Sequence, residues 1–265
     1  MLRYNDEEIK IGHFPDGTLL LKDNENHELW DNKILWFYEN NEELVALVFF
    51  VKHLRDNGIS RLSLYMPYVP NARQDRVKTD ADVFTLKYFC EIINSLNFNE
   101  VWVMDTHSSV TDALINNVRF IDHIPYINYA ISDINVESLL LFYPDQGSVK
   151  RYADDIGMEY AFGIKNRDWE TGKILGLDVA GAVDKIKGRS ILIVDDICSK
   201  GGTFYHAAKK LKELGAGDIY LYVTHCENTI FDGELIKGDL IKHIYTTDSL
   251  LTKIDEKITV TDILI

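Results

Sequence analysis

The sequence predicts an α/β protein made of two similar doubly wound domains, each with a central, mostly parallel sheet. Three observations support this fold class. Apolar runs of strand length alternate with amphipathic segments of helix length, which is the pattern of βαβ units. Polar clusters follow the apolar runs, at the rim where right-handed crossovers bring the carboxyl ends of parallel strands together. The chain has 265 residues, 46% of them hydrophobic, which is enough for the cores of two small domains.

The strands and helices are predicted from hydrophobic periodicity and from Gly or Pro near their ends. The predicted helices span residues 42–57, 84–96, 149–156 and 203–214, and the predicted strands span residues 62–66, 101–104, 139–142, 160–164, 191–194 and 219–224. Residues 13–18 are predicted as a turn before a short alternating segment. The domain boundary is expected within residues 125–134, which gives domains at residues 1–128 and 129–265.

The clearest strand–loop–helix unit contains two acids and two glycines. Asp195 and Asp196 stand where the apolar strand 191–194 should end, and Gly201 and Gly202 allow a close approach of the backbone to a ligand. The helix that follows presents free N–H groups and the positive end of its dipole, which together form an anion site. The two carboxylates would accept hydrogen bonds from hydroxyl groups, so a sugar phosphate is the ligand class that fits both parts.

The composition excludes some functions. The formal net charge is −14, and phosphate neutralisation on a nucleic acid needs clustered Lys and Arg, so we expect no nucleic-acid partner. The cysteines Cys90, Cys198 and Cys226 are scattered without metal-site spacing, which is typical of a reduced, cytoplasmic protein. No apolar run approaches the roughly 20 residues of a membrane helix, so no membrane partner is expected.

A second polar loop follows the predicted strand 62–66. In it Arg73 and Arg76 flank Gln74 and Asp75. Arginine suits forked contacts to phosphate oxygens, the glutamine could hydrogen-bond a base edge, and the aspartate could hold the second arginine in place. On these residues alone, an ordinary solvated loop with a local ion pair worth about 0–1 kcal/mol stays open.

Together these stretches resemble the phosphoribosyl diphosphate (PRPP) synthetase family, also called ribose-phosphate diphosphokinases, within the type I phosphoribosyltransferase fold. The order and approximate spacing of the family's motifs agree from about residue 12 to about residue 260. The matching segments are residues 14–18, 67–76, 105–107, 144–147, 165–168, 191–203 and 223–225.

The resemblance implies transfer of the diphosphoryl group of Mg-ATP to the anomeric hydroxyl of ribose 5-phosphate, giving PRPP and AMP, with ATP on the N-terminal domain and ribose 5-phosphate on the C-terminal domain. The implied ATP-binding residues are Phe14, Asp16, Arg73, Gln74, Asp75 and His107, and the implied ribose 5-phosphate-binding residues are Asp195, Asp196, Ser199, Lys200, Gly201, Gly202 and Thr203. His107 and Asp145 would serve Mg²⁺, and Lys165 and Arg167 would be catalytic residues on a loop that closes over the transferring group. We expect a homo-oligomer, a dimer or a larger assembly.

The sequence departs from the family pattern at several positions. Thr18 replaces Glu, Ser199 and Lys200 replace Asp-Thr, and Asn166 and Asp168 change the charge of the expected lid. These changes keep open a catalytically silent homologue with a regulatory or scaffold role. A phosphoribosyltransferase that consumes PRPP is a further alternative, against which the arginine-containing loop argues.

Overall fold

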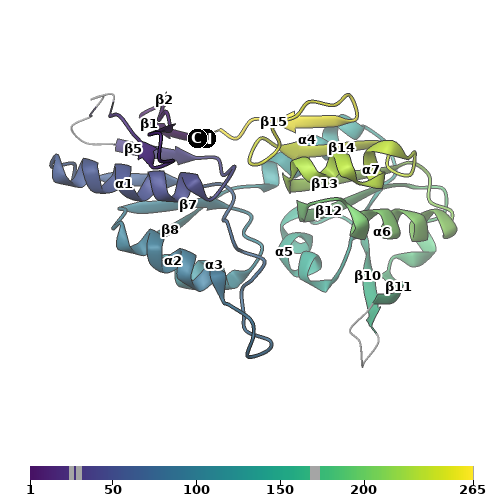
Figure 1. Cartoon of the computed structure of the whole chain (residues 1–265). Helices are drawn as coiled ribbons and strands as arrows, with labels where there is room; N and C mark the ends of the chain where they lie inside the picture. The colour runs from purple at the N-terminus through teal and green to yellow at the C-terminus, as the bar shows by residue number, and fades with distance from the viewer. Residues whose placement is uncertain (24–26, 28–31, 168–173, 265) are drawn as a thin grey trace. The chain divides into compact units, whose positions relative to one another are not determined.

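The computed structural model describes residues 1–23, 27, 32–167 and 174–264, with the backbone alone described at residues 165–167 and 174–176. The chain divides into two compact units, Met1–Asp122 and His123–Leu264, which we call the N-terminal unit and the C-terminal unit (Figure 1). The expected boundary between residues 128 and 129 lies within α4 (Ile124–Ile134), and the division of the structure lies just before that helix. Within the described ranges, every helix is too short or too polar to cross a bilayer.

The N-terminal unit contains a sheet with the strand order β2-β1-β5-β6-β7-β8. Its strands are β1 (Leu2–Tyr4), β2 (Glu7–Glu8), β5 (Asn32–Trp36), β6 (Leu62–Tyr65), β7 (Glu100–Met104) and β8 (Val118–Ile121). The last four are parallel, whereas β1 pairs with antiparallel neighbours. Its helices are α1 (Glu42–Asp56), α2 (Thr85–Ser95) and α3 (Ser109–Leu114), and a separate hairpin joins β3 (Gly12–His13) to β4 (Leu19–Leu20).

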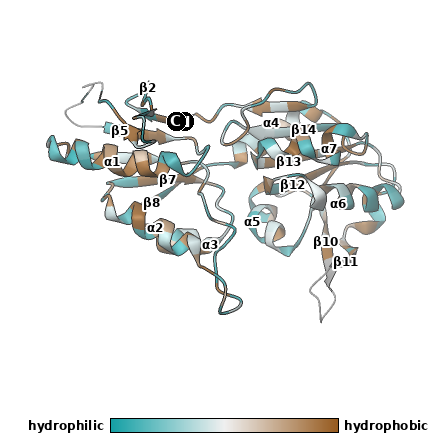
Figure 2. Cartoon of the chain, viewed as in Figure 1, coloured by the Kyte–Doolittle hydropathy of each residue, from teal (hydrophilic) through white to brown (hydrophobic). Residues whose placement is uncertain are grey.

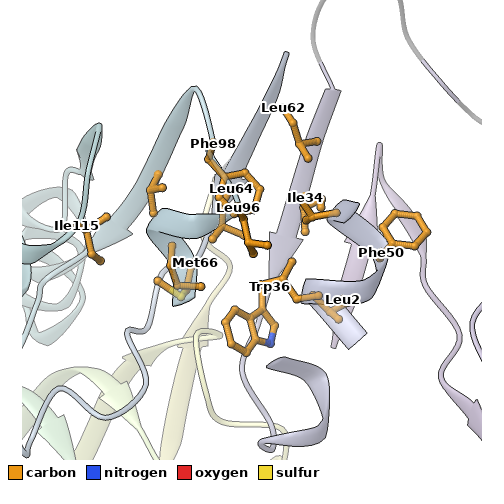
Figure 3. Close-up of a cluster of buried hydrophobic side chains, with 14 of the residues drawn as sticks. Leu2, Ile34, Trp36, Phe50, Leu62, Leu64, Met66, Leu96, Phe98 and Ile115 are labelled. Atoms are coloured by element: carbon orange, nitrogen blue, oxygen red, sulfur yellow. The ribbon is translucent and has the colours of Figure 1, made fainter. Parts of the chain in front are cut away.

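The core of the N-terminal unit lies between this sheet and its helices. Ile34 and Leu64 point from adjacent parallel strands into a cluster that also holds Leu47 of α1 and Phe89 of α2. Figure 3 shows part of this cluster, with Trp36, the last residue of β5, near Leu2 of β1. Hydrophilic and hydrophobic residues are interleaved along α1, as expected for a helix with one buried face (Figure 2). Because α1 and α2 pack on one cluster, they cover the same face of the sheet.

The C-terminal unit contains a sheet with the strand order β11-β10-β9-β12-β13-β14-β15. Its strands are β9 (Leu139–Tyr143), β10 (Tyr160–Arg167), β11 (Ile174–Gly181), β12 (Ser190–Cys198), β13 (Ile219–Cys226), β14 (His243–Thr247) and β15 (Ile258–Thr261). All neighbours are parallel except β10 and β11. Besides α4, the helices are α5 (Gln146–Ile156), α6 (Gly202–Glu213) and α7 (Glu234–Lys237), with 3₁₀ turns η1 (Val183–Lys185) and η2 (Asn228–Asp232).

Both faces of the second sheet are covered. One core holds Ile193 together with residues of α6 and α7, and the other holds Leu192 together with residues of α4 and α5. The chain leaves β9 through α5 towards β10 and leaves the adjacent β12 through α6 in the opposite direction, towards β13. The gap between β9 and β12 is therefore the topological switch point, where open α/β sheets bind ligands. This confirms the predicted α/β class with mostly parallel sheets.

Some element limits differ from the prediction because tertiary pairing overrides local preference. β12 continues through Asp195 and Asp196 to Cys198, since the neighbouring β13 runs on to Cys226 and pairs with it. β10 continues to Arg167 because it pairs with β11 in an antiparallel hairpin. Several elements were not predicted as such, namely β1, β2, β5, α3, β8, α4, β11, η1, η2, α7, β14 and β15.

Candidate active site

In the N-terminal unit, the loops after β6 and β7 are tied together by one carboxylate. Asp75 accepts two hydrogen bonds from Arg76, at 2.7 Å from Nε and 2.7 Å from Nη2, and a third at 2.6 Å from Ser108 Oγ. The Arg76 and Ser108 hydrogen bonds hold the pKa of the Asp75 carboxyl well below its usual range. Ser108 follows His107, whose side chain is exposed at the end of the β7 loop. The predicted pairing of Asp75 with Arg76 is therefore present, and it links the two loops.

The β3–β4 hairpin carries Phe14 and Asp16. The Phe14 ring is 51% exposed. Asp16 accepts hydrogen bonds from the Thr18 hydroxyl at 2.7 Å and from the Thr18 backbone N–H at 3.0 Å, which lower its pKa. His13 pairs with Glu42, the first residue of α1. This pair attaches the hairpin to the N-terminal end of α1.

Two more of the predicted ATP-binding residues lie in the loop that follows β6. Gln74 and Arg73 lie in the β6 loop and are exposed. The side-chain oxygen of Gln74 accepts a hydrogen bond from Thr85 Oγ1 at 2.9 Å, which joins the loop to the start of α2. The structure therefore places Arg73, Gln74, Asp75 and His107 in the loops that follow β6 and β7, and it places the other two predicted ATP-side residues, Phe14 and Asp16, on the separate β3–β4 hairpin.

In the C-terminal unit, α5 supplies partners to the acid pair at the end of β12. Ser148 Oγ donates to Asp195 at 2.8 Å, and Arg151 Nη1 lies 2.9 Å from Asp196 Oδ2. The two α5 residues are three positions apart, so they share one helix face. Asp145 stands at the N-cap of the same helix and accepts from the backbone N–H groups of residues 147 and 148, at 2.9 and 3.2 Å. The structure thus brings Asp145 close to the acid pair across the switch point.

This arrangement concentrates negative charge. Burial raises the pKa of the Asp195 carboxyl well above its ordinary value, and the charges of Asp196 and then Asp145 raise it further. A divalent cation near these acids would offset that repulsion. In the described ranges, no three His, Cys, Asp or Glu side chains are arranged to hold a metal by themselves. Mg²⁺ usually keeps water ligands and takes one or two carboxylates together with substrate phosphates, and Asp145 and the acid pair offer carboxylates of that kind.

The loop after β12 leads directly into α6. Gly201 stands at the N-cap of α6 with φ +79°, a left-handed conformation that favours glycine, and it contributes no side-chain cap. The backbone N–H groups of the first helical turn therefore remain for a ligand. A Cβ added at Gly202 would meet nothing within 4 Å, so the space over this turn is open. Lys200 and Thr203 are exposed beside it.

The predicted catalytic residues lie on a strand. The backbone of Lys165 pairs with Leu177, and that of Arg167 pairs with Ile174, in the β10–β11 hairpin. They continue a strand whose parallel neighbour is β9, which leads to Asp145. Their side chains and residues 168–173, the rest of the expected lid, lie outside the described part of the chain.

The sequence analysis assigned no role to three polar residues of the C-terminal unit, although Ser148 belongs to the polar cluster that follows the predicted strand 139–142. Ser148 and Arg151 carry no further signal than their spacing, three and six residues after Asp145. Glu227 accepts a hydrogen bond from Ser199 Oγ at 2.5 Å, and only the alignment of β12 with β13 brings these two residues together.

Comparison with known proteins gives concordant results. A family model described as the phosphoribosyl synthetase-associated domain matches residues 176–264. The chain is 31% identical over 229 residues to a ribose-phosphate pyrophosphokinase of Thermococcus kodakarensis, covering 82% of this chain and 77% of the relative. It is 27% identical over 271 residues to one of Pyrococcus abyssi, covering 97% and 89%. The crystal structure of phosphoribosylpyrophosphate synthetase from Mycobacterium smegmatis shares the fold, with a TM-score of 0.82, 20% identity, and coverage of 97% of this chain and 86% of that chain.

Proposed function

Because this chain belongs to the ribose-phosphate pyrophosphokinase family, we propose that it transfers the diphosphoryl group of ATP to the anomeric hydroxyl of ribose 5-phosphate, giving PRPP and AMP. One observation carries the proposal. Asp195 and Asp196 lie near the end of β12 at the switch point, and the uncapped N-terminus of α6 follows four residues after that strand. Acceptors for sugar hydroxyls and donors for a phosphate are therefore present on one short segment.

Ribose 5-phosphate occupies this segment in the proposal. The carboxylates of Asp195 and Asp196 accept hydrogen bonds from the ribose hydroxyls. The phosphate lies over the first turn of α6, where the backbone N–H groups of residues 201–203 and the helix dipole favour an anion. Lys200 adds a positive charge, and Ser199 begins the loop.

ATP occupies the rim of the N-terminal unit. The exposed Phe14 ring offers a face for the adenine, with Asp16 and Gln74 as polar contacts for the base or its ribose. Arg73 lies in the loop that Asp75 fixes, and its guanidinium suits the phosphate oxygens. The support for this assignment is the location of Arg73, Gln74, Asp75 and His107 in two loops, after β6 and β7, that the Asp75–Ser108 hydrogen bond joins.

Diphosphoryl transfer needs in-line positioning and neutralisation of charge more than covalent help from the protein. The anomeric oxygen forms a bond to the β-phosphorus, the bond from that phosphorus to the oxygen shared with the α-phosphate breaks, and the hydroxyl proton leaves. Lys165 and Arg167 are the proposed catalytic residues, stabilising negative charge on the transferring group. Their place on β10, beside β9, supports this role.

The proposed cofactor is Mg²⁺, and the proposed metal-site residues are His107 in the N-terminal unit and Asp145 in the C-terminal unit, each considered within its own unit. When bound, the cation would neutralise charge on the phosphate oxygens. The crowded carboxylates of Asp145, Asp195 and Asp196 support this choice. We also propose that the chain works as a homo-oligomer in the cytoplasm, with small-molecule substrates and neither nucleic acid nor membrane as partner.

A single assay tests the function. The chain is incubated with Mg²⁺, ATP and ribose 5-phosphate, and AMP and PRPP are measured together by anion-exchange chromatography. Equal amounts of AMP and PRPP support the proposal. AMP without PRPP would show hydrolysis alone, and a folded chain without turnover would favour the silent homologue. Addition of EDTA should abolish turnover, and Mg²⁺ in excess should restore it.

A further inference from the structure

The loop at residues 199–203 is supported by the stretch that follows the next strand, residues 227–237, which we call the supporting segment. Cys198 and Cys226 are register partners at the ends of β12 and β13. The Glu227 backbone N–H donates to the Cys198 carbonyl at 2.8 Å. Ser199 and Glu227 therefore leave the sheet side by side.

One carboxylate then joins the two stretches. Ser199 Oγ donates to Glu227 Oε2 at 2.5 Å, and Thr229 Oγ1 donates to the same oxygen at 3.0 Å. Hydrogen bonds to a carboxylate are roughly twice as strong as those between neutral groups. The first residue of the loop is thereby tied to the start of the supporting segment.

The supporting segment also packs closely against the loop at two further places. A Cβ at Gly233 would lie 1.9 Å from the Lys200 carbonyl oxygen, so only glycine allows the supporting segment to come this near. A Cβ at Gly201 would lie 2.2 Å from Leu235 Cδ1, so the buried Leu235 side chain lies directly against the N-cap of α6. The supporting segment, which follows β13, therefore restricts the conformation of the loop at residues 199–203.

We propose that Glu227 is a positioning residue for ribose 5-phosphate, which acts through Ser199 to hold the loop where the first-turn N–H groups of α6 meet the phosphate. In the family pattern stated above, position 199 is Asp. Here position 199 is Ser, and the carboxylate beside it belongs to Glu227, which follows the end of the neighbouring strand β13. The inference rests on the proposed function for the identity of its ligand.

The test compares two variants by calorimetric titration with ribose 5-phosphate and, separately, with Mg-ATP. Glu227→Leu removes the acceptor of the Ser199 and Thr229 hydroxyl groups and should weaken ribose 5-phosphate binding by about tenfold, the scale of one charge-assisted hydrogen bond. Glu227→Gln keeps an acceptor for Ser199 and should stay within about threefold of the wild type. Mg-ATP affinity should not change in either variant. Glu234→Leu, which removes an exposed carboxylate from the same segment, is the matched control and should leave both affinities unchanged.

A double-mutant cycle shows whether Glu227 acts through Ser199. Ser199→Ala should lower the affinity for ribose 5-phosphate, and adding Glu227→Leu to it should cause little further loss. Additive losses, or an equal loss of Mg-ATP affinity, would overturn the inference, as would a wild-type chain that does not bind ribose 5-phosphate. A wild-type chain that binds this sugar phosphate but makes no AMP would overturn the proposed function, whereas the affinities would still decide the role of Glu227.

Discussion

Arg151 Nη1 lies 2.9 Å from Asp196 Oδ2 in the C-terminal unit, where Asp196 is buried. The neighbouring Asp195 accepts a hydrogen bond from the Ser148 hydroxyl group, whereas Asp196 has a cation as its partner. The two acids of the proposed ribose site therefore differ in kind. Asp196 is paired with a guanidinium, whereas burial and the neighbouring acids raise the pKa of Asp195.

Replacement of Arg151 should destabilise the protein, because it leaves a buried carboxylate without its cation. Arg151→Met is expected to lower the free energy of unfolding by about 3 kcal/mol, measured by urea denaturation at neutral pH. Adding Asp196→Asn to the Arg151→Met variant removes the buried charge and should recover part of that loss.

An exposed ion pair provides the control for this prediction. Arg119 Nε lies 3.5 Å from Glu100 Oε1 on the surface of the N-terminal unit. Arg119→Met should cost less than about 1 kcal/mol. Equal small losses for Arg119→Met and Arg151→Met would show that Asp196 is solvated well enough to need no partner.

The raised pKa of Asp195 predicts how the free energy of unfolding changes with pH. Its pKa is raised in the folded protein above the unfolded value of about 3.9, so the folded state binds the proton more tightly. Stability is therefore lost as the pH rises from the unfolded pKa towards the folded pKa. Asp195→Asn cannot titrate, and it should become more stable than the wild type by about 1 kcal/mol at neutral pH, with a smaller difference near about pH 4.

Asp82 provides a control, because its pKa is shifted in the opposite direction to that of Asp195. Its carboxylate accepts hydrogen bonds from the backbone N–H groups of Thr79 at 2.7 Å and Lys78 at 2.9 Å, which lower its pKa. Asp82→Asn should therefore be less stable than the wild type at neutral pH, with a difference that disappears in acid. Urea denaturation at several pH values measures both variants. A gain for Asp195→Asn that did not grow with pH would contradict the first prediction.

The two glycines before α6 should respond differently to substitution. Gly202→Ala adds a Cβ in open space, so the variant should fold normally but lose about a hundredfold in kcat/KM for ribose 5-phosphate, because the methyl group displaces the phosphate. Gly201→Ala meets Leu235 and a positive φ, and should lose about 2–3 kcal/mol of stability. Thermal unfolding and steady-state kinetics separate the two effects. Unchanged kinetics in Gly202→Ala would place the phosphate elsewhere.

Much of the fold could be predicted from local patterns. The helices α1 and α2 and the strands β6, β7 and β9 were predicted within one or two residues at each end. The helices and β6 have a regularly spaced buried face, and β9 is a continuous apolar run that is buried throughout. β11 was missed, although Leu175, Leu177 and Val179 alternate with Gly176 and Asp178 as in a strand. Glycine and aspartate in that run resemble turn residues, and only pairing with β10 makes the segment a strand.

The candidate site was predictable where its chemistry is local. The acid pair and the glycines that follow it lie within nine residues of each other in sequence, numbered 195–203. Arg151 and Glu227 belong to the same region of the structure but are distant along the chain. They reach it because β9 and β13 both flank β12, an order that no single stretch of sequence contains.

The last prediction concerns the proposed catalytic lysine. Lys165→Ala should lower kcat by about 10³-fold or more, the scale of a supplied cation in phosphoryl transfer, while the dissociation constant of Mg-ATP stays close to the wild-type value. Stopped-time assays of AMP and PRPP measure turnover, and calorimetry measures nucleotide binding. Lys187→Ala, at an exposed position of the same unit, should leave both unchanged. Near-normal turnover in Lys165→Ala would remove Lys165 from the catalytic residues and leave Arg167 as the proposed source of positive charge.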